Sequence, residues 1–402
     1  MARKRAEPNA EPQTTQLLLP SAAIGPEHFL TLIRTGTATS RGALARMTGL
    51  SRSTVAQRVD ALIEAGYVRE SGPGTSSGGR PPAVLEFDGS GKLVLSAAID
   101  RTQLVVGLVN FAGAVVDRRV RDLRVADGPA IVLPLVEAEL RTLIVDGHVP
   151  ASSLSGIGIA VPAPVEHRTG RPIEPTIMPG WHDCPIREEF EQAFALPVYV
   201  DNDANVMALA EYRSLEHVVG NMLYVRASDG IGAGLVFGGK LYRGAVGAAG
   251  ALGHTAVDGC TALCTCGNRG CVAAVASGQA IAKQLRDAGL DTNNAADLVR
   301  FARQGQQDVA AMLRTAGRYL GRVLAGVVNL LDPGAVVIGG ELAEVHDFLA
   351  GIREEAYGRA LPLAAGHLQI LKASLGADAA IKGAATLVAE ELLALRPVLG
   401  QG

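Results

Sequence analysis

The residues with the most definite chemistry are a histidine and three cysteines in one short stretch: His254, Cys264, Cys266 and Cys271. Three thiolates and one imidazole make a closed tetrahedral Zn²⁺ site with no position left for water, so such a site is structural rather than catalytic. The two glycines between Cys266 and Cys271 let the backbone wrap tightly enough for both thiolates to reach the same ion. The spacing therefore predicts a structural zinc site.

The other two cysteines leave the ligand set open at one point. Cys260 lies close in sequence and could replace one of the three thiolates, whereas Cys184 stands alone and is expected to be a small core residue. Five cysteines in 402 residues do not form a disulfide framework. The alternative to a metal site is a set of buried free thiols.

A second group of polar side chains indicates a nucleic-acid partner. Ser40 is a suitable N-cap for a helix that runs to about residue 48, Gly49 fits the left-handed turn after it, and Ser51 caps the next helix. Two helices joined by a turn of about four residues form a helix-turn-helix. The residues expected to contact base edges and phosphates of a double-stranded DNA operator on these helices are Arg41, Ser51, Arg52, Ser53, Thr54, Gln57 and Arg58.

The flanking segments complete a winged helix-turn-helix domain over residues 25–88. Residues 26–34 are expected to form an amphipathic helix, and residues 67–70 and 80–87 a β-ribbon around a Gly/Ser loop. Arg80 would then touch the minor groove or a phosphate. Residues 1–24 lack periodicity and are expected to be a flexible arm. The alternative is a three-helix protein-interaction module whose polar face is only solvated.

The charge distribution favours DNA as the partner of this N-terminal part. The whole chain has a net charge of −3, but residues 1–86 hold ten Lys/Arg and seven Asp/Glu, so this part is +3 and the rest is −6. Because the total is close to neutral, DNA binding must come from a local surface. No stretch approaches the roughly 18 apolar residues of a membrane span, and the N-terminus has no apolar signal core. A soluble cytoplasmic protein without a membrane partner is expected.

Beyond about residue 88 the chain consists of short apolar runs that alternate with helical patterns, which predicts an α/β domain over residues 89–402. Two strand–turn–strand segments begin near Leu93 and near Met222 and suggest an internal duplication. Residues 308–331 form a long amphipathic pattern. Either a core helix or a contribution to a dimer interface is expected there.

The order of motifs along the chain resembles the ROK family, whose name joins repressors, open reading frames and kinases. The matching segments are Ser40–Ser71, Gly79–Pro82, Gly156–Pro162, Pro179–Trp181, Asp201–Asn205, Gly230–Gly234, Gly250–His254, the cysteine cluster and Val337–Gly340. This resemblance implies a two-lobed, actin-like (ribonuclease-H-type) sugar-kinase fold after the winged helix-turn-helix, with the ligand cleft between the lobes. It also implies that the last helix, around residues 384–395, returns to pack on the first lobe.

ROK proteins comprise sugar kinases and sugar-responsive regulators, and two loops of this chain argue against a kinase. Kinases of the family carry Asp-x-Gly-Gly-Thr after the first strand, where this chain has Asp100-Arg-Thr-Gln103, without glycine and with a shorter turn. Their second phosphate loop begins Gly-Thr-Gly, where Asp229 here would set a carboxylate against a polyanion. Asp203 matches the catalytic-base position, but it is expected to be vestigial, so the protein is not expected to be an enzyme.

The resemblance also places the ligand-binding candidates Asn202, Asp203 and His254 in the sugar site. Other polar sugar contacts of the family are replaced by Ile177, Ala251 and Ala273. Each replacement removes a partner for a sugar hydroxyl. An unmodified sugar, a modified sugar, a sugar phosphate and no small ligand at all therefore stay open.

Together these features predict a zinc-containing DNA-binding regulator of carbon or sugar metabolism, acting as a repressor, whose degenerate kinase body serves as sensor or dimerisation module. A homodimer or homotetramer is expected, because one recognition helix gives little specificity and paired half-sites supply the rest. The alternatives are an active sugar kinase with an added DNA-binding head and a scaffold that binds a protein partner.

Overall fold

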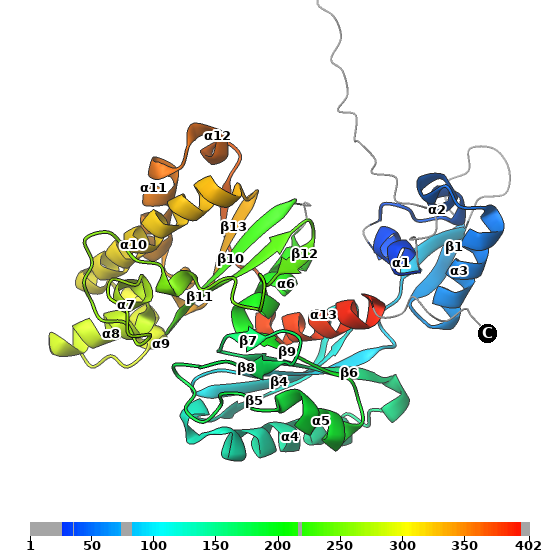
Figure 1. The fold of residues 1–402 in the computed structure, drawn as a ribbon, viewed down its shortest axis with the longest axis horizontal. Helices are drawn as coiled ribbons and strands as arrows, with labels where there is room; N and C mark the ends of the chain where they lie inside the picture. The colour runs from blue at the N-terminus through cyan, green and yellow to red at the C-terminus, as the bar shows by residue number, and fades with distance from the viewer. Residues whose placement is uncertain (1–25, 35, 74–82, 216–218, 395–402) are drawn as a thin grey trace, which may run out of the picture. The chain divides into compact units, whose positions relative to one another are not determined.

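The computed structural model describes residues 26–34, 36–73, 83–215 and 219–394, and the chain divides into two compact units (Figure 1). Residues 1–89 and 393–402 make up the first unit, and residues 90–392 make up the second. Among the described residues, no helix is long and apolar enough to cross a membrane.

The first unit is a winged helix-turn-helix. Its elements are α1 (Pro26–Arg34), α2 (Arg41–Thr48), α3 (Arg52–Glu64), and the antiparallel strands β1 (Val68–Pro73) and β2 (Ala83–Phe87). Phe29 of α1, Leu44 of α2, and Val55 and Val59 of α3 are fully buried and form its core. The predicted flexible arm, residues 1–24, and the predicted wing contact Arg80 lie outside the described residues.

The helix boundaries follow from capping residues that the sequence identifies. The Ser40 hydroxyl accepts a hydrogen bond from the Ala43 backbone N–H at 3.2 Å, and Gly49 ends α2 in the left-handed conformation with φ of 69°. The Ser51 hydroxyl accepts from the Thr54 backbone N–H at 3.1 Å. These contacts satisfy N–H groups that a helix start leaves without a partner. The predicted helix-turn-helix is therefore confirmed in its caps as well as in its helices.

The second unit contains two five-stranded sheets with the same topology. The first has the order β5-β4-β3-β6-β9, and the second has the order β12-β11-β10-β13-β14. Their strands are β3 (Leu93–Ile99), β4 (Gln103–Asn110), β5 (Val115–Asp122), β6 (Leu154–Val161) and β9 (Val198–Asn202), then β10 (Asn221–Ala227), β11 (Ile231–Phe237), β12 (Lys240–Tyr242), β13 (Ala335–Gly339) and β14 (Gln369–Lys372). In the first sheet β3 pairs antiparallel with β4 and parallel with β6. In the second sheet β10 pairs in the same way with β11 and β13. This repeat is the structural counterpart of the duplication that the sequence suggests.

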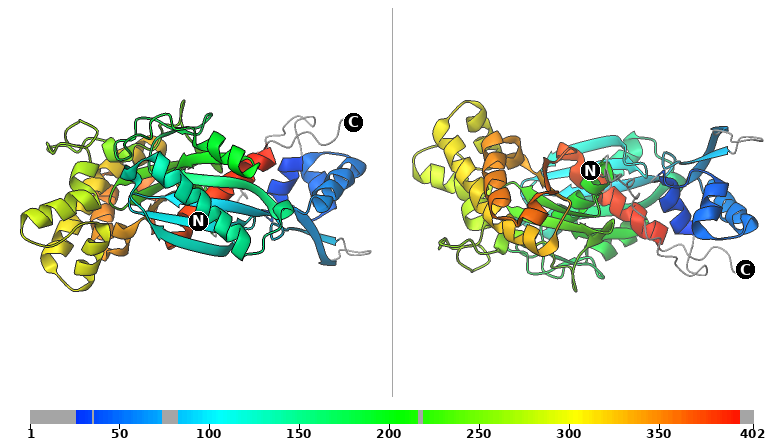
Figure 2. Two further views of the ribbon diagram at one scale, coloured as in Figure 1. Left: turned by 90° about the horizontal axis from the view of Figure 1, so that it is seen from below. Right: turned by 90° about the horizontal axis from the view of Figure 1, so that it is seen from above.

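Helices cover both sheets and fill the space between them (Figure 1). The outer face of the first sheet packs on α4 (Pro129–Asp146) and α5 (Ile186–Phe194), and Figure 2 shows α4 lying across it. The outer face of the second sheet packs on α7 (Ala273–Ala276), α8 (Gly278–Asp287), α9 (Ala295–Arg303), α10 (Gln307–Leu331), α11 (His346–Arg359) and α12 (Pro362–Ala365). Between the sheets lie α6 (Asp203–Ser214) and α13 (Ala379–Ala394).

Helix α10 is the long amphipathic segment that the sequence leaves open between core and interface. Leu313, Leu320, Leu324 and Val328 are fully buried, and α10 packs along α11. Its apolar face is therefore core.

Helix α13 packs on the first sheet, as the family resemblance implies, and glycines set how closely it lies. A Cβ atom at Gly158 of β6 would lie inside contact distance of the Ala384 carbonyl oxygen, and one at Gly156 would lie 2.8 Å from a methyl of Val388. Gly383 on the helix approaches the backbone of α6 in the same way. Small residues thus let two helices share the narrow space between the sheets.

We expect Gly158→Ala to lower the free energy of unfolding by about 1–3 kcal/mol, since the added methyl meets backbone atoms that cannot move alone. The matched control is Gly326→Ala in α10, where a Cβ meets nothing within 4 Å; it should be neutral or stabilising by up to about 1 kcal/mol. Urea denaturation can be followed by the fluorescence of Trp181, the single tryptophan, which lies in the core beside the first sheet and so reports on the lobe built around that sheet. Equal stability of Gly158→Ala and wild type would contradict the close packing of α13.

Candidate functional site

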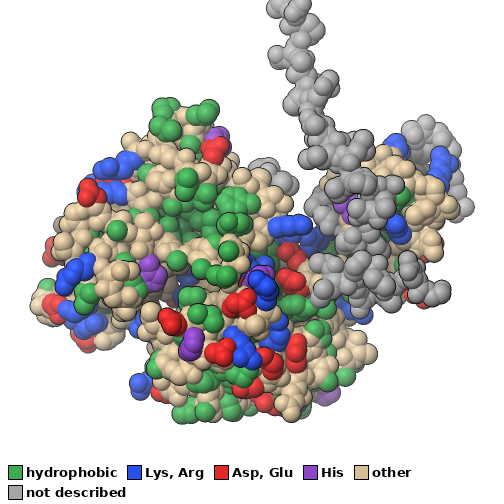
Figure 3. Space-filling model, viewed as in Figure 1, with side chains coloured by type: hydrophobic (Ala, Val, Ile, Leu, Met, Phe, Trp, Pro, Cys, Tyr) green, Lys and Arg blue, Asp and Glu red, His purple; other side chains and the backbone are tan. Residues whose placement is uncertain are grey.

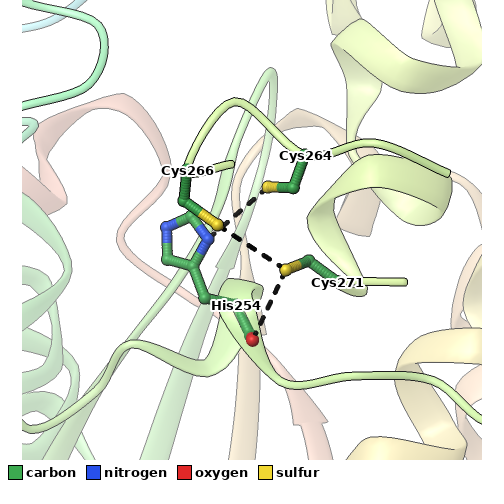
Figure 4. Close-up of side chains that lie close together, drawn as sticks. All are labelled: His254, Cys264, Cys266 and Cys271. Carbon is green, nitrogen blue, oxygen red and sulfur yellow. Dashed lines mark hydrogen bonds between the residues drawn. The ribbon is translucent and has the colours of Figure 1, made fainter. Parts of the chain in front are cut away.

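The His/Cys cluster predicted from the sequence is assembled in the second unit. The ligand atoms of His254, Cys264, Cys266 and Cys271 all lie within 4.8 Å of one another. The Cys264 Sγ lies 3.6 Å from the His254 Nδ1, and the Cys266 and Cys271 Sγ atoms are 3.8 Å apart. Figure 4 shows these side chains turned toward a common point. Three sulfurs and one imidazole nitrogen in this arrangement fit the donor set of a tetrahedral zinc site.

The loop that carries the cysteines depends on glycine. Gly267 and Gly270 have φ of 89° and 78°, in the left-handed region that other residues avoid. A Cβ at Gly270 would lie 2.5 Å from the carbonyl oxygen of Cys260. Cys260 therefore contributes backbone to the packing of the loop, and its thiol is not part of the four-residue cluster.

The pKa values of two of the thiols shift in opposite directions. A hydrogen bond from the Asn268 backbone N–H lowers the pKa of Cys266, whereas burial raises the pKa of Cys271 to about 12. Metal binding requires both sulfurs as thiolates, and a bound cation supplies the positive charge that ionises a buried thiol. The donor set of this cluster is one that could hold a metal ion.

A cavity of about 270 Å³ opens between the two sheets of the second unit. Its walls come from the ends of β3, β10, β13 and β14, from the 3-10 turn Glu341–Glu344 after β13, and from α6 and α13. The carboxylates on these walls are Asp100, Asp203, Glu211, Glu341 and Glu344, against the cations Arg226 and Lys372. The lining therefore has an excess of negative charge, which opposes a phosphate-bearing ligand.

Arg226, at the end of β10, joins the two lobes across this cleft. Its guanidinium lies 2.5 Å from the Asp100 carboxylate and 2.9 Å from the Asp203 carboxylate. The side chains of Arg226 and Asp203 are only 12% and 11% exposed. The Arg226 guanidinium thus lies between Asp203, at the start of α6, and Asp100, which directly follows β3.

The pKa shifts agree with a buried charge-balanced group. Burial works against the charge on Arg226, but the carboxylates of Asp100 and Asp203 outweigh it and raise its pKa. Burial raises the pKa of Asp203, and the nearby Asp100 adds to this, while Arg226 opposes it. Arg226 is therefore always charged, and it is the group that makes an ionised Asp203 tolerable at this depth.

The loops that follow β3 and β10 are held by hydrogen bonds within the protein. Between β3 and β4 the Asp100 backbone N–H donates to the Gln103 carbonyl at 2.8 Å, so the turn is short. In the other loop the Asp229 carboxylate accepts from the Ala295 backbone N–H at 2.7 Å and from Gln279 at 3.2 Å. Asp229 thus stabilises the first turn of α9 and fixes this loop against the second lobe.

The three sugar-site candidates all have partners within the protein. Asn202 caps α6 by accepting from the Ala204 backbone N–H at 2.9 Å, and its Nδ2 donates to the Ala163 carbonyl at 3.0 Å. Asp203 pairs with Arg226, and His254 faces the cysteines. Their sugar-binding role stays a prediction, because each contact also gives the residue a structural role.

The candidate DNA-contacting residues differ in exposure and in the partners that they have within the protein. Arg52, Ser53 and Gln57 are exposed on α3. Arg41 instead forms ion pairs with Asp60 at 2.5 Å and with Glu70. The Ser51 hydroxyl caps α3, and the Thr54 hydroxyl lies 2.8 Å from the Ser51 hydroxyl. The Arg58 guanidinium lies 5.7 Å from the centre of the Phe29 ring. The Ser53 hydroxyl also lies 2.9 Å from the Ser51 hydroxyl, so Arg52 and Gln57 are the strongest candidates for base contacts.

The face of the second unit seen in Figure 3 intersperses Lys/Arg with Asp/Glu and has no extended basic area. This pattern gives no electrostatic reason to assign DNA contacts to that face.

Sequence reasoning missed the residue that organises the cleft. Arg226 ends an apolar strand, and a charged residue at such a position is rarely buried without a partner. That pattern could have marked it as unusual. Its partner Asp100 is 126 residues away in the chain, so the pairing itself could not be predicted from local sequence.

Two family models match the chain. The model described as ROK family matches residues 99–391, and the one described as winged helix-turn-helix DNA-binding matches residues 31–69. The xylose repressor of Bacillus subtilis is 30% identical over 358 residues, which cover 88% of this chain and 92% of that protein. An N-acetylmannosamine kinase of Escherichia coli is 32% identical over 299 residues, which cover 74% of this chain and 99% of the kinase.

A solved structure extends the similarity to both units. The crystal structure of a ROK family transcriptional regulator, described as a homologue of the E. coli Mlc protein, has a TM-score of 0.79 and 26% identity. The match covers 93% of this chain and 98% of that one. The kinase match covers a smaller share of the chain than the repressor match.

Arg226→Met should lower the free energy of unfolding by about 3–5 kcal/mol near neutral pH, because it leaves the buried Asp203 carboxylate without a counter-charge. Burial raises the folded-state pKa of Asp203, so its contribution to stability is present at low pH and is lost as the pH rises through that pKa. The variant, which lacks the opposing guanidinium, should therefore regain stability as the pH falls. Urea denaturation over a pH series measures this.

The matched control is Arg226→Met with Asp203→Asn. The amide removes the titrating group, so the double variant should recover part of the lost stability and show a flatter pH profile. A single variant as stable as wild type at all pH values would contradict the proposed charge balance.

Proposed function

The chain belongs to the ROK family, and we propose that it is a DNA-binding transcriptional repressor that responds to a sugar or sugar derivative. Residues 25–88 would bind a double-stranded DNA operator, and residues 89–402 would sense the ligand and form the oligomer. The observation that carries the proposal is the combination of an exposed polar face on α3 with a cleft whose kinase positions are neutralised by Arg226. A DNA operator as partner implies a cytoplasmic site of action.

The absence of kinase activity is part of the same proposal. A general base must reach the proton of the sugar hydroxyl, but the Asp203 carboxylate is bound to a guanidinium that is permanently charged. ATP would also have to enter a cleft with an excess of carboxylates and without a glycine-rich turn after β3. We therefore propose that the body binds its ligand without chemistry.

The regulatory step would be a change in the spacing of two DNA-reading heads. In a homodimer or homotetramer, paired recognition helices contact two half-sites, and their separation sets the affinity for the operator. A ligand that binds one arrangement of the two lobes more tightly shifts the population toward it. Xylose is the first ligand to test, since four repressor relatives carry that name.

Replacing Arg52 and Gln57 together by Ala should abolish sequence-specific operator binding while leaving the fold intact, because both side chains are exposed. Loss of two bidentate base contacts weakens specific binding by about 2–6 kcal/mol. Electrophoretic shifts with operator and scrambled DNA measure it, after genome-wide footprinting has identified the operator.

The matched control for the double variant is Lys283→Ala, which removes an exposed charge on α8 of the second unit. It should bind the operator like wild type. Operator binding that survived the Arg52/Gln57 change would show that the recognition face is misassigned, and phosphoryl transfer from ATP to a sugar by wild-type protein would refute the non-enzymatic proposal. Binding of a protein partner with no sugar response would favour a scaffold instead.

We also propose that His254, Cys264, Cys266 and Cys271 hold one structural Zn²⁺. The ion would supply the positive charge that keeps the thiolates ionised and would tie the Cys264–Cys271 loop to the segment that carries His254. No step of ligand binding needs to pass through it, because a four-ligand site is closed to substrate.

His254→Ala and Cys264→Ser should each reduce bound zinc from about one ion per chain and lower the melting temperature. Cys184→Ser is the matched control, since that buried thiol lies outside the cluster. Metal analysis and thermal denaturation with and without a chelator give the measurements. Wild-type protein purified without any metal would contradict the zinc proposal.

A further inference from the structure

A second cavity, of about 180 Å³, lies in the second unit on the first-lobe side. It is bounded by the turn between the short strands β7 (Val165–Glu166) and β8 (Arg171–Pro172), by α5, by β9, by the segment after β12, and by α13. Its lining residues are His167, Arg168, Arg187, Tyr199, Arg243 and Glu391, with Val200, Asp201 and Leu387. None of the ligand-binding candidates discussed above is among them.

Arg187 is the unusual group in this cavity. The Arg187 Nη1 donates to the Arg168 carbonyl oxygen at 2.6 Å, but the Arg187 Nε is inaccessible to solvent and has no hydrogen-bond partner. No carboxylate of the described residues lies within 4.0 Å of its guanidinium. The neighbouring Glu188 carboxylate interacts with the Arg187 charge through space, but the buried Nε–H still lacks an acceptor, which is costly, so Arg187 has an unused donor.

The carboxylates in the cavity do not supply the missing charge. The Asp201 Oδ2 lies 2.7 Å from the Arg243 Nε, and its Oδ1 accepts from the Asn205 Nδ2 at 2.8 Å, so both oxygens are engaged. Glu391 lies 3.9 Å from Arg243 and is 39% exposed. Arg168, Arg187 and Arg243 therefore all belong to the lining. Both lining carboxylates lie close to Arg243, while Glu166 and Glu188, which are not part of the lining, lie near Arg168 and Arg187.

Tyr199 adds a neutral donor to the same wall. Burial raises the pKa of Tyr199, so its hydroxyl stays protonated and can donate a hydrogen bond to an anion. Guanidinium and hydroxyl donors are the groups that bind oxyanions, and arginine in particular matches the geometry of phosphate; residues of both kinds line this cavity.

We infer that this cavity is a second ligand site, separate from the cleft between the lobes, and that it binds the phosphate group of a small molecule. Arg187 contributes a positive charge and the donor that lacks an acceptor, and Arg168, which is 77% exposed and lies 3.9 Å from Glu166, adds a second guanidinium to the lining. The source of the phosphate is either the free ion or a phosphorylated metabolite such as a sugar phosphate. The inference concerns a site outside the sugar cleft and does not depend on the proposed DNA-binding function.

The site is placed where an occupant would affect other parts of the unit. Arg243 begins the segment that leads to His254, and this segment packs closely on β7, because a Cβ at Gly247 would overlap the Val165 carbonyl oxygen. Glu391 belongs to α13. An anion that draws Arg243 toward Arg187 would therefore act on this segment and on the α13 contact together.

The test is thermal denaturation of the full chain, followed by Trp181 fluorescence, in inorganic phosphate and in chloride at equal ionic strength. Phosphate should raise the melting temperature saturably, since it binds the folded state only. Arg187→Gln should weaken phosphate binding about tenfold or more, because it removes a positive charge and the donors of the guanidinium. Lys283→Gln, an exposed charge loss elsewhere, should respond like wild type.

Two further arms make the result decisive. A phosphorylated metabolite would be identified as the ligand if a hexose phosphate stabilises the protein at lower concentration than inorganic phosphate, while the hexose alone leaves the phosphate midpoint unchanged. The free ion would be identified if inorganic phosphate stabilises the protein at lower concentration than the hexose phosphate. If Arg187→Gln does not fold, Arg168→Gln at the rim should fold and weaken phosphate binding about threefold or more. No saturable effect of phosphate in wild type, or an effect that survives in the folded arginine variants, would overturn the inference.

Discussion

The charge balance around Arg226 is the interaction on which the character of the cleft depends. The Arg226 guanidinium lies 2.5 Å from the Asp100 carboxylate and 2.9 Å from the Asp203 carboxylate. The side chains of Arg226 and Asp203 are largely closed to water, whereas Asp100 is 44% exposed. In such surroundings a cation and two anions are tolerable together, but removal of one member leaves an uncompensated charge. Asp203 therefore has a structural role in the cleft, because its carboxylate balances the charge of Arg226.

The packing of the helices between the sheets determines that these charges meet. The end of β10 reaches the end of β3 only because α6 and α13 lie close to both sheets, and they do so over strand glycines such as Gly158 and Gly234. A Cβ at Gly234 would lie 2.5 Å from the Ala204 carbonyl oxygen of α6. A sheet with larger residues at these positions would hold the lobes farther apart, and an arginine could not span the gap to two carboxylates.

The parts that could be predicted from the sequence are those governed by local rules. Ser40, Gly49 and Ser51 mark helix ends by hydrogen bonds within a few residues, and the four metal-ligand candidates lie within one loop and the turn before it. The pairing of Arg226 with Asp100 joins distant parts of the chain, and no local pattern specifies it. Arg41 illustrates the same limit: its position on α2 suggests DNA, but its partners Asp60 and Glu70 lie on α3 and β1.

The segment from Arg243 to His254 connects these features through rigid contacts. Arg243 pairs with Asp201, the Gly250 backbone lies against the Ala233 carbonyl of β11, and His254 belongs to the cysteine cluster. Glycines occupy the close approaches, so the backbone cannot move a fraction of an ångström at one point without displacing a neighbouring strand. Closely packed interfaces of this kind change between discrete arrangements rather than deforming gradually. A ligand that bears on either end of the segment therefore acts on the whole segment, and this gives the protein a physical route by which occupancy of a cavity can alter the body as a unit.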